Sequence, residues 1–272
     1  TLSASSAASD VYKRQPDYSV NFIGDLNNTG EVAFTRRDYY SFTGGFKRPS
    51  LSSGTNLNLG SNDIGALTLQ NNRAKDINTK FAAANFSWSP KSNIDLGGFA
   101  IFSNSRNELQ QNRLIQYTDA GIGIPNEETQ SNTFQENNLG MLKFSTKYQP
   151  DASNQLDYEV FGQLSKSEQD QRFFSSINSS INQLEKTTPY NISQNLNYYY
   201  TLSENDIFAL EAQHVIKDED PFYNAILEDK LNYDSTAANL GLDSTQSNYN
   251  LNQEKRVQSN QLDAKLDYWR IL

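Results

Sequence analysis

The single histidine of the chain, His214, is the one side chain that could act as the base of a serine-type catalytic triad. It lies in the segment LEAQHVI, and the alternation of that segment places it on the apolar face of an extended strand. We therefore interpret His214 as an interfacial side chain and not as a catalytic base. The absence of cysteine excludes a Cys nucleophile, a disulfide scaffold and a thiolate zinc site.

Acidic residues cluster in two places. Asp218, Glu219 and Asp220 lie in KDEDPFYN, where carboxylates could bind Ca²⁺, but the spacing is not that of an EF-hand and a proline interrupts it. Glu127 and Glu128 are adjacent, so in an extended segment they point in opposite directions and cannot converge on one glycosidic bond. We interpret the first cluster as the solvated base of a loop. We predict no enzyme activity, no cofactor and no metal site.

The most distinctive candidate for ligand binding is the segment FTRRDYYSFTGGF. Its Arg36, Arg37, Tyr39 and Tyr40 are residue types that often anchor binding interfaces. A packed hairpin inside a long loop is the other interpretation of this segment. The glycines in TGG and GIGIPN match neither phosphate-binding fingerprint, and we interpret them as loop bends.

Composition restricts the class of protein. The formal net charge is -9 and the pI is near 4.7, which does not suit a nucleic-acid-binding protein. Hydrophobic residues make up 36% of the chain, yet aromatic residues reach 12%, which is unlike a disordered chain. No apolar run is long enough for a transmembrane helix, although strands of a membrane barrel need only alternate.

Period-two alternation is the main structural signal. In 156–166, Leu156, Tyr158, Val160 and Leu164 share one face, and Phe161 is the exception on the other. The same pattern recurs in 18–26, 81–89, 139–149, 194–202, 207–217 and 261–268, and more weakly in 94–104, where Phe99 and Ile101 break it. We predict an all-β chain with about eight strands of roughly ten residues, which is the length at which a tilted strand crosses a bilayer.

The connections between these segments alternate in length. Short turns are expected at 90–93, 150–154 and 203–206, and long connections at 27–78, 105–137, 167–193 and 218–260. This asymmetry predicts a partial antiparallel up-and-down transmembrane β-barrel with short periplasmic turns and long extracellular loops. A soluble β-sandwich or β-repeat adhesin also alternates, and a disordered surface chain is a further alternative.

Aromatic residues lie beside the short turns. Tyr and Trp favour the membrane–water interface, so we predict that they form a periplasmic girdle. Its predicted members are Trp88, Tyr148, Tyr158, Tyr200, Tyr268 and Trp269.

Residues 5–15, SSAASDVYKRQ, resemble the in-frame translation of a transposase sequencing adapter. We expect residues 1–15 to be an unstructured artefact. We expect residues 16–272 to be part of a barrel whose remaining strands lie elsewhere.

The segments VNFIGDLNNTGEVAFTRRDYYSFTGGF, FSWSPKSNIDLGGFAIFSN and LSENDIFALEAQHVIKDEDPFYNAI resemble the barrel of TonB-dependent receptors from Bacteroidetes. The resemblance implies a bacterial outer-membrane receptor that imports an external nutrient with energy from the inner membrane. Its partners would be outer-membrane lipid, a nutrient, peptide or glycan, and the TonB complex, which acts through a plug region missing here. A passive porin or assembly-type barrel and a secreted β-rich adhesin remain the alternatives.

Overall fold

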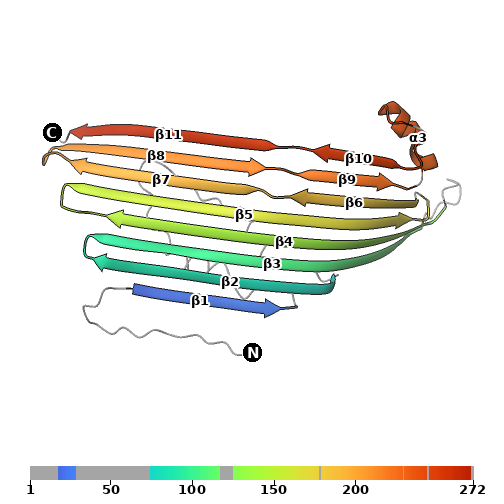
Figure 1. Cartoon of the computed structure of the whole chain (residues 1–272), viewed down its shortest axis with the longest axis horizontal. Coiled ribbons are helices and arrows are strands. Elements are labelled where there is room, and N and C mark those ends of the chain that lie inside the picture. Colours follow the sequence, from blue (N-terminus) through green and yellow to red (C-terminus); the bar gives the residue numbers. More distant parts are fainter. Residues whose placement is uncertain are drawn as a thin grey trace.

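The computed structural model describes residues 18–28, 74–116, 125–177, 179–228, 230–243 and 245–270. These residues form one antiparallel sheet of eleven strands, with a short helix at one end (Figure 1). Sequential long strands pair side by side, so the predicted all-β class and up-and-down order are confirmed. The sheet is not closed into a barrel.

The first five strands are β1 Tyr18–Asn27, β2 Ala74–Lys91, β3 Ile94–Ile115, β4 Glu127–Tyr148 and β5 Asn154–Ser175. The later elements are β6 Ser179–Thr187, β7 Tyr190–Thr201, β8 Asp206–Glu219, β9 Phe222–Leu227, α3 Lys230–Asn239, β10 Tyr249–Glu254 and β11 Val257–Arg270.

Three pairs of strands are collinear. β6 and β7 both pair with β5, where Thr187 lies opposite Ser167 and Tyr190 lies opposite Leu164. β8 continues into β9, and β10 into β11, in the same way (Figure 1). The eleven strands therefore run in eight lanes, which matches the number of crossings expected from the alternation.

β3, β4 and β5 are about twice as long as predicted, with 22 residues each. The outer halves of β3 and β4 fill most of the segment 105–137, and the outer half of β5 together with β6 fills most of 167–193. Both segments were expected to be long loops. The loop prediction was wrong there because these halves are polar on both faces. Without an apolar face the period-two signal disappears. The backbone hydrogen-bond ladder between β3 and β4 nevertheless continues without a break, from Ile94 opposite Tyr148 to Ile115 opposite Glu127.

The residues that broke the alternation belong to a cluster of buried apolar side chains. Phe99, Ile101 and Phe161 are buried together on the face opposite the alternating apolar residues, and the ring centroids of Phe99 and Phe161 are 6.4 Å apart. The cluster consists of Phe81, Ala83, Phe99, Ile101, Leu139, Met141 and Phe161. These residues are a second apolar patch and not an irregularity of the strands.

The short turns lie where they were predicted, at the left edge of Figure 1. In the turn after β4, Asp151 accepts hydrogen bonds from the backbone N–H of Ser153 at 2.8 Å and the side-chain amide of Asn154 at 2.9 Å. These bonds, led by that from Asn154, lower the pKa of the Asp151 carboxyl. Short polar side chains thus replace the backbone partners that the reversal removes.

The helix α3 lies at the opposite end of the sheet, within the last expected loop (Figure 1). Its end is a Schellman motif, in which Gly241 has φ 72° and the N–H of Leu242 donates to Ala237 O at 2.9 Å. The buried Tyr249 of β10 donates to Asp234 of the helix, and this bond raises the pKa of Tyr249 to about 12. The sequence KLNYDSTAAN has no apolar stripe, so the helix was not predicted.

Two edges of the described sheet are unpaired. One belongs to β1 and the other to the lane of β10 and β11.

Candidate functional surface

Every lane carries its even-numbered side chains on the same face of the sheet. The antiparallel registers pair even with even, as in Tyr18 with Trp88, Leu142 with Gly162 and Leu266 with Leu210. The exceptions are the two ends of the β2–β3 pairing, where Ala74 lies opposite Leu109 and Lys91 lies opposite Ile94. Because strand side chains alternate, the sheet has an even face and an odd face from β1 to β11. The two faces have different chemistry, and the even face is divided into layers along the strands.

The turn-side half of the even face is an apolar band. We define it as the even-numbered residues of 18–26, 82–88, 94–102, 140–148, 156–164, 190–200, 208–216 and 262–268. None of these described residues is Asp, Glu, Lys or Arg. Many are exposed in the sheet, including Val20 at 72%, Leu142 at 63% and Leu266 at 72%. A large contiguous apolar surface of this kind marks an interaction with a membrane or a protein.

Aromatic residues lie at the turn end of the band. Of the predicted girdle, Trp88, Tyr148, Tyr158, Tyr200 and Tyr268 share the even face. Trp269 follows Tyr268 directly in β11 and lies on the odd face. Two residues that the sequence analysis did not include belong to the same layer, namely Tyr18 and Tyr198.

Three tyrosine hydroxyl groups of this layer donate to polar side chains. Tyr198 donates to Asn154 Oδ1 at 2.6 Å, and Tyr268 donates to Asp206 Oδ1 at 2.5 Å. Both acceptors lie at the starts of strands, beside the short turns, so these two rings cover the apolar band while their polar tips point toward the turns, as interfacial tyrosines do. Tyr158 differs, because it donates to Gln194 Oε1 at 2.9 Å, within the band and away from the turn.

The odd face at the same height carries charged side chains as well as the buried apolar cluster described above. Lys143 and Glu159 form an ion pair at 2.8 Å, and Lys265 and Asp267 form one at 2.6 Å. Asp157, Glu211 and Asp263 occupy the same face of neighbouring lanes. At the height of the band, the charged side chains of the described strands therefore lie on the odd face, and the even face has none.

On the even face, a layer of ion pairs borders the band on the side away from the short turns. Three even-face ion pairs lie there: Arg106 with Glu136 at 3.2 Å, Lys186 with Glu168 at 3.1 Å, and Arg256 with Asp218 at 2.8 Å. The hydrogen bond from Arg106 lowers the pKa of the Glu136 carboxyl. Every even-face ion pair in the described residues lies outside the band.

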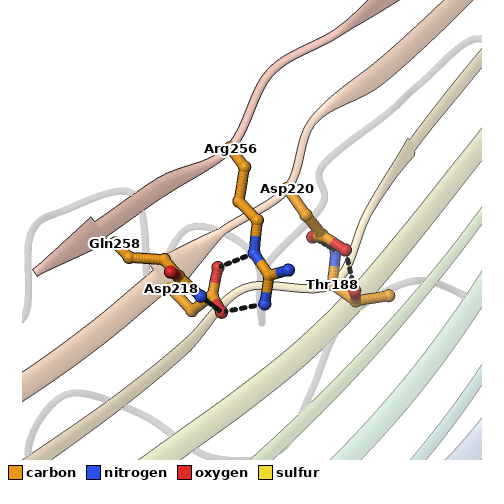
Figure 2. Close-up of polar contacts among 5 residues, drawn as sticks. All are labelled: Thr188, Asp218, Asp220, Arg256 and Gln258. Atoms are coloured by element: carbon orange, nitrogen blue, oxygen red, sulfur yellow. Dashed lines mark hydrogen bonds and ion pairs between the residues drawn. The ribbon is translucent and has the colours of Figure 1, made fainter.

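The third ion pair is part of a cluster at the breaks in three adjacent lanes (Figure 2). The Arg256 guanidinium donates to both oxygens of Asp218 at 3.2 and 2.8 Å, and Gln258 donates to Asp218 Oδ2 at 2.8 Å. Asp220 accepts from the backbone N–H and the hydroxyl group of Thr188. These side chains replace ladder hydrogen bonds where Thr188, Asp220 and Arg256 lie outside the strands.

The outermost layer of the even face contains a shallow groove of about 520 Å³. It is lined by residues of β4, β5, β6 and β9, most of them polar. Gln130, Asn132, Asp170 and Arg172 supply amide, carboxylate and guanidinium groups, and Phe174 supplies a ring that is 49% exposed.

The sequence candidates for chemistry are distributed without a catalytic arrangement. His214 lies on the even face, and its Nε2 lies 2.8 Å from Asn260 Oδ1. Asp218 and Asp220 are engaged by Arg256 and Thr188, as described above. In the described residues, no group of three or more His, Cys, Asp or Glu side chains is placed to hold a metal ion.

Glu127 accepts from Ser175 Oγ at 2.5 Å, and the adjacent Glu128 faces the other way. Arg36, Arg37, Tyr39 and Tyr40 lie outside the described residues.

Comparisons with known proteins give no match for this chain among protein-family models, curated proteins or solved structures. Within the described residues, no helix is both long and apolar enough to cross a membrane.

Proposed function

We propose that this chain forms part of the wall of an outer-membrane β-barrel, with its even face against lipid, and that the protein is a TonB-dependent receptor that imports an external nutrient. The wall is supported by the apolar band. The transport activity is supported only by the resemblance of three sequence segments. The Arg and Tyr residues of the segment 34–46 are the proposed ligand contacts.

The height of the band is the observation that carries the proposal. From Leu156 to Leu164 the band contains nine residues, which extend about 30 Å along the strand. At a strand tilt of about 40°, this length gives a height of roughly 23 Å, close to the apolar belt of about 25 Å on outer-membrane barrels. Aromatic residues border the belt at the turn end, as expected at a membrane–water interface, and ion pairs border it at the other end.

The unpaired edges fit a wall that is completed by further strands. In lipid, each unpaired backbone group is costly, so an open edge is not tolerated in the apolar region. We propose that strands outside the described residues pair with β1 and with the lane of β10 and β11.

Single-cysteine labelling tests the wall, because the chain has no native cysteine. Leu142→Cys and Leu266→Cys probe the even face, and Ser145→Cys and Gln261→Cys probe the odd face of the same strands. The protein, expressed from its complete gene, is recovered in outer membranes. The even-face cysteines are expected to resist a charged maleimide, and fluorophores attached to them are expected to be quenched by lipid-embedded quenchers. A soluble adhesin predicts rapid labelling of Leu142→Cys and Leu266→Cys, because both positions are exposed in the sheet.

A separate experiment tests transport. Deletion of this gene and deletion of TonB are each compared for growth on a panel of single nutrients. A TonB-dependent receptor predicts that both deletions abolish uptake of the same nutrient. A passive porin predicts loss of uptake in the gene deletion alone.

A further inference from the structure

The groove in the outermost layer of the even face has unused hydrogen-bonding capacity. In the described residues, the side chains of Gln130, Asn132, Asp170 and Arg172 have no hydrogen-bond or ion-pair partner within the chain. They lie in two adjacent lanes, with Asn132 directly opposite Arg172 and Gln130 opposite Phe174. Four polar side chains thus face outward around one exposed ring.

This combination matches the chemistry of a saccharide. A sugar has hydroxyl groups around its rim, which both donate and accept, and an apolar face of C–H groups. Amides offer both roles, the carboxylate accepts and the guanidinium donates. The electron-rich face of Phe174 suits the C–H face of a sugar ring. The groove is lined by two acidic side chains, Asp170 and Glu228, and one basic side chain, Arg172, so it lacks the excess positive charge that a phosphate would require.

The position of the groove indicates where the saccharide comes from. The groove lies on the same face as the apolar band, which under the proposed function faces lipid. Along β5, Asp170 is six residues and Phe174 ten residues beyond Leu164, the last band residue. These separations correspond to about 15 and 25 Å of height above the apolar layer, at about 3.3 Å per residue and a tilt of about 40°.

Phospholipid headgroups do not extend to that height. The polar region of a bilayer is only about 5–8 Å thick on each side. A lipid whose acyl chains lie beside the band contacts the groove only if its headgroup extends well beyond the phosphate group. We propose that the groove binds the oligosaccharide head of a glycolipid in the surrounding outer leaflet. This proposal rests on the membrane-facing assignment of the even face.

The test uses the protein in phospholipid nanodiscs, prepared from its complete gene. Three probes are titrated: core-bearing lipopolysaccharide, lipid A without core sugars, and the free core oligosaccharide. The double variant Asn132→Ala, Arg172→Ala removes two free side chains of the groove. The matched control is Thr133→Ala, Gln169→Ala, which changes the odd face of the same two strands. Labelling of Leu142→Cys in each background reports correct insertion.

Core-bearing lipopolysaccharide is expected to bind the native protein at least tenfold more tightly than lipid A, and the double variant is expected to lose that preference. The control is expected to keep it. Equal binding of lipid A would overturn the proposal, because a short head does not reach the groove. If the free core oligosaccharide binds as tightly as core-bearing lipopolysaccharide, the proposal that the saccharide comes from the membrane is overturned. If the probes change only the oligomeric state of the protein, the groove binds another protein and the proposal is also overturned. If labelling shows insertion but the double variant keeps its preference, the inference fails while the proposed wall remains.

Discussion

Gly98 and Gly162 lie on the same face of the sheet, yet a methyl group added at each position meets different surroundings. At Gly98 it would lie 2.5 Å from Lys143 O and 2.8 Å from the Phe86 ring, which covers this glycine from the neighbouring strand. At Gly162 nothing lies within 4 Å. The ring of Phe86 therefore uses the space that a side chain at position 98 would need.

We expect Gly98→Ala to destabilise the protein by about 1–3 kcal/mol, the usual cost of overpacking a close contact. Gly162→Ala is the matched control and is expected to change stability little. The measurement is the urea midpoint for loss of the compact, heat-modifiable form in detergent micelles. Equal midpoints for the two variants would contradict the close approach of Phe86 to Gly98.

The ion pair of Asp218 and Arg256 makes the outer lanes sensitive to acid. Hydrogen bonds, first from Arg256 and then from Gln258, lower the pKa of the Asp218 carboxyl below its value of about 3.9 in an unfolded chain. A carboxyl with a lowered folded pKa stabilises the fold above the unfolded value, and this contribution is lost as the pH falls through the folded value.

The prediction is tested by hydrogen exchange of β10 in native protein and in Asp218→Asn. At pH 7 the variant is expected to exchange faster, and near pH 2 the two proteins are expected to exchange alike. Glu204→Gln, in an exposed turn, serves as the control and is expected to match the native protein at both values. A difference that persists at pH 2 would show that the charge of Asp218 does not hold the strand.

At the scale of the strands, the sequence was informative only where one face is apolar. The alternation located the turn-side halves of β2, β3, β4, β5, β7, β8 and β11 and the three short turns. It missed the outer halves of β3 and β4, where residues such as Asn107 and Gln135 pair in register although both faces are polar. Ladder hydrogen bonds form regardless of side-chain polarity, so an absent hydrophobic pattern does not predict a loop.

The breaks in the lanes have a partial sequence explanation. Pro189 and Pro221 cannot donate to the ladder, and each follows a residue that lies outside the strands. Their carbonyl groups still accept, from Ser165 N at 3.0 Å and Lys255 N at 3.1 Å. Two prolines predict two breaks. Their alignment with the third break, next to Arg256, depends on register and is visible only in the structure.

The free edges of β1 and of the β10–β11 lane give a prediction for the 272-residue chain by itself. Exposed edges pair with other chains in water and leave backbone groups unpaired in lipid. We therefore expect this chain, refolded without further strands, to aggregate in buffer and to show no heat-modifiable form in detergent. Size-exclusion chromatography and unheated gels provide the measurement. A compact soluble monomer would contradict the interpretation of these edges.

At the scale of the whole molecule, the functional surface could be predicted only in part. Alternation correctly placed Trp88, Tyr148, Tyr158, Tyr200 and Tyr268 on one face, since the registers pair even-numbered with even-numbered residues at these positions. It could not predict the layer of ion pairs or the groove, because these depend on which residues of distant strands lie opposite each other. Arg172 and Asn132 are separated by 40 positions in the sequence and become neighbours only through the pairing of β4 with β5.

The even face gives opposite predictions in water and in lipid, and Leu262 distinguishes them. Through the registers it is level with Val160, in the middle of the band, and it is 70% exposed in the sheet. For a soluble protein, Leu262→Arg replaces an exposed side chain and is expected to change stability by no more than about 0.5 kcal/mol. For a lipid-facing wall, arginine near the bilayer midplane is expected to cost about 2–4 kcal/mol.

Gln261→Arg, on the odd face of the same strand, is the control and is expected to cost little in either case. The unfolding free energies of the full gene product in phospholipid vesicles provide the comparison. A selective loss in Leu262→Arg would support lipid contact, and equal values for the two variants would contradict it.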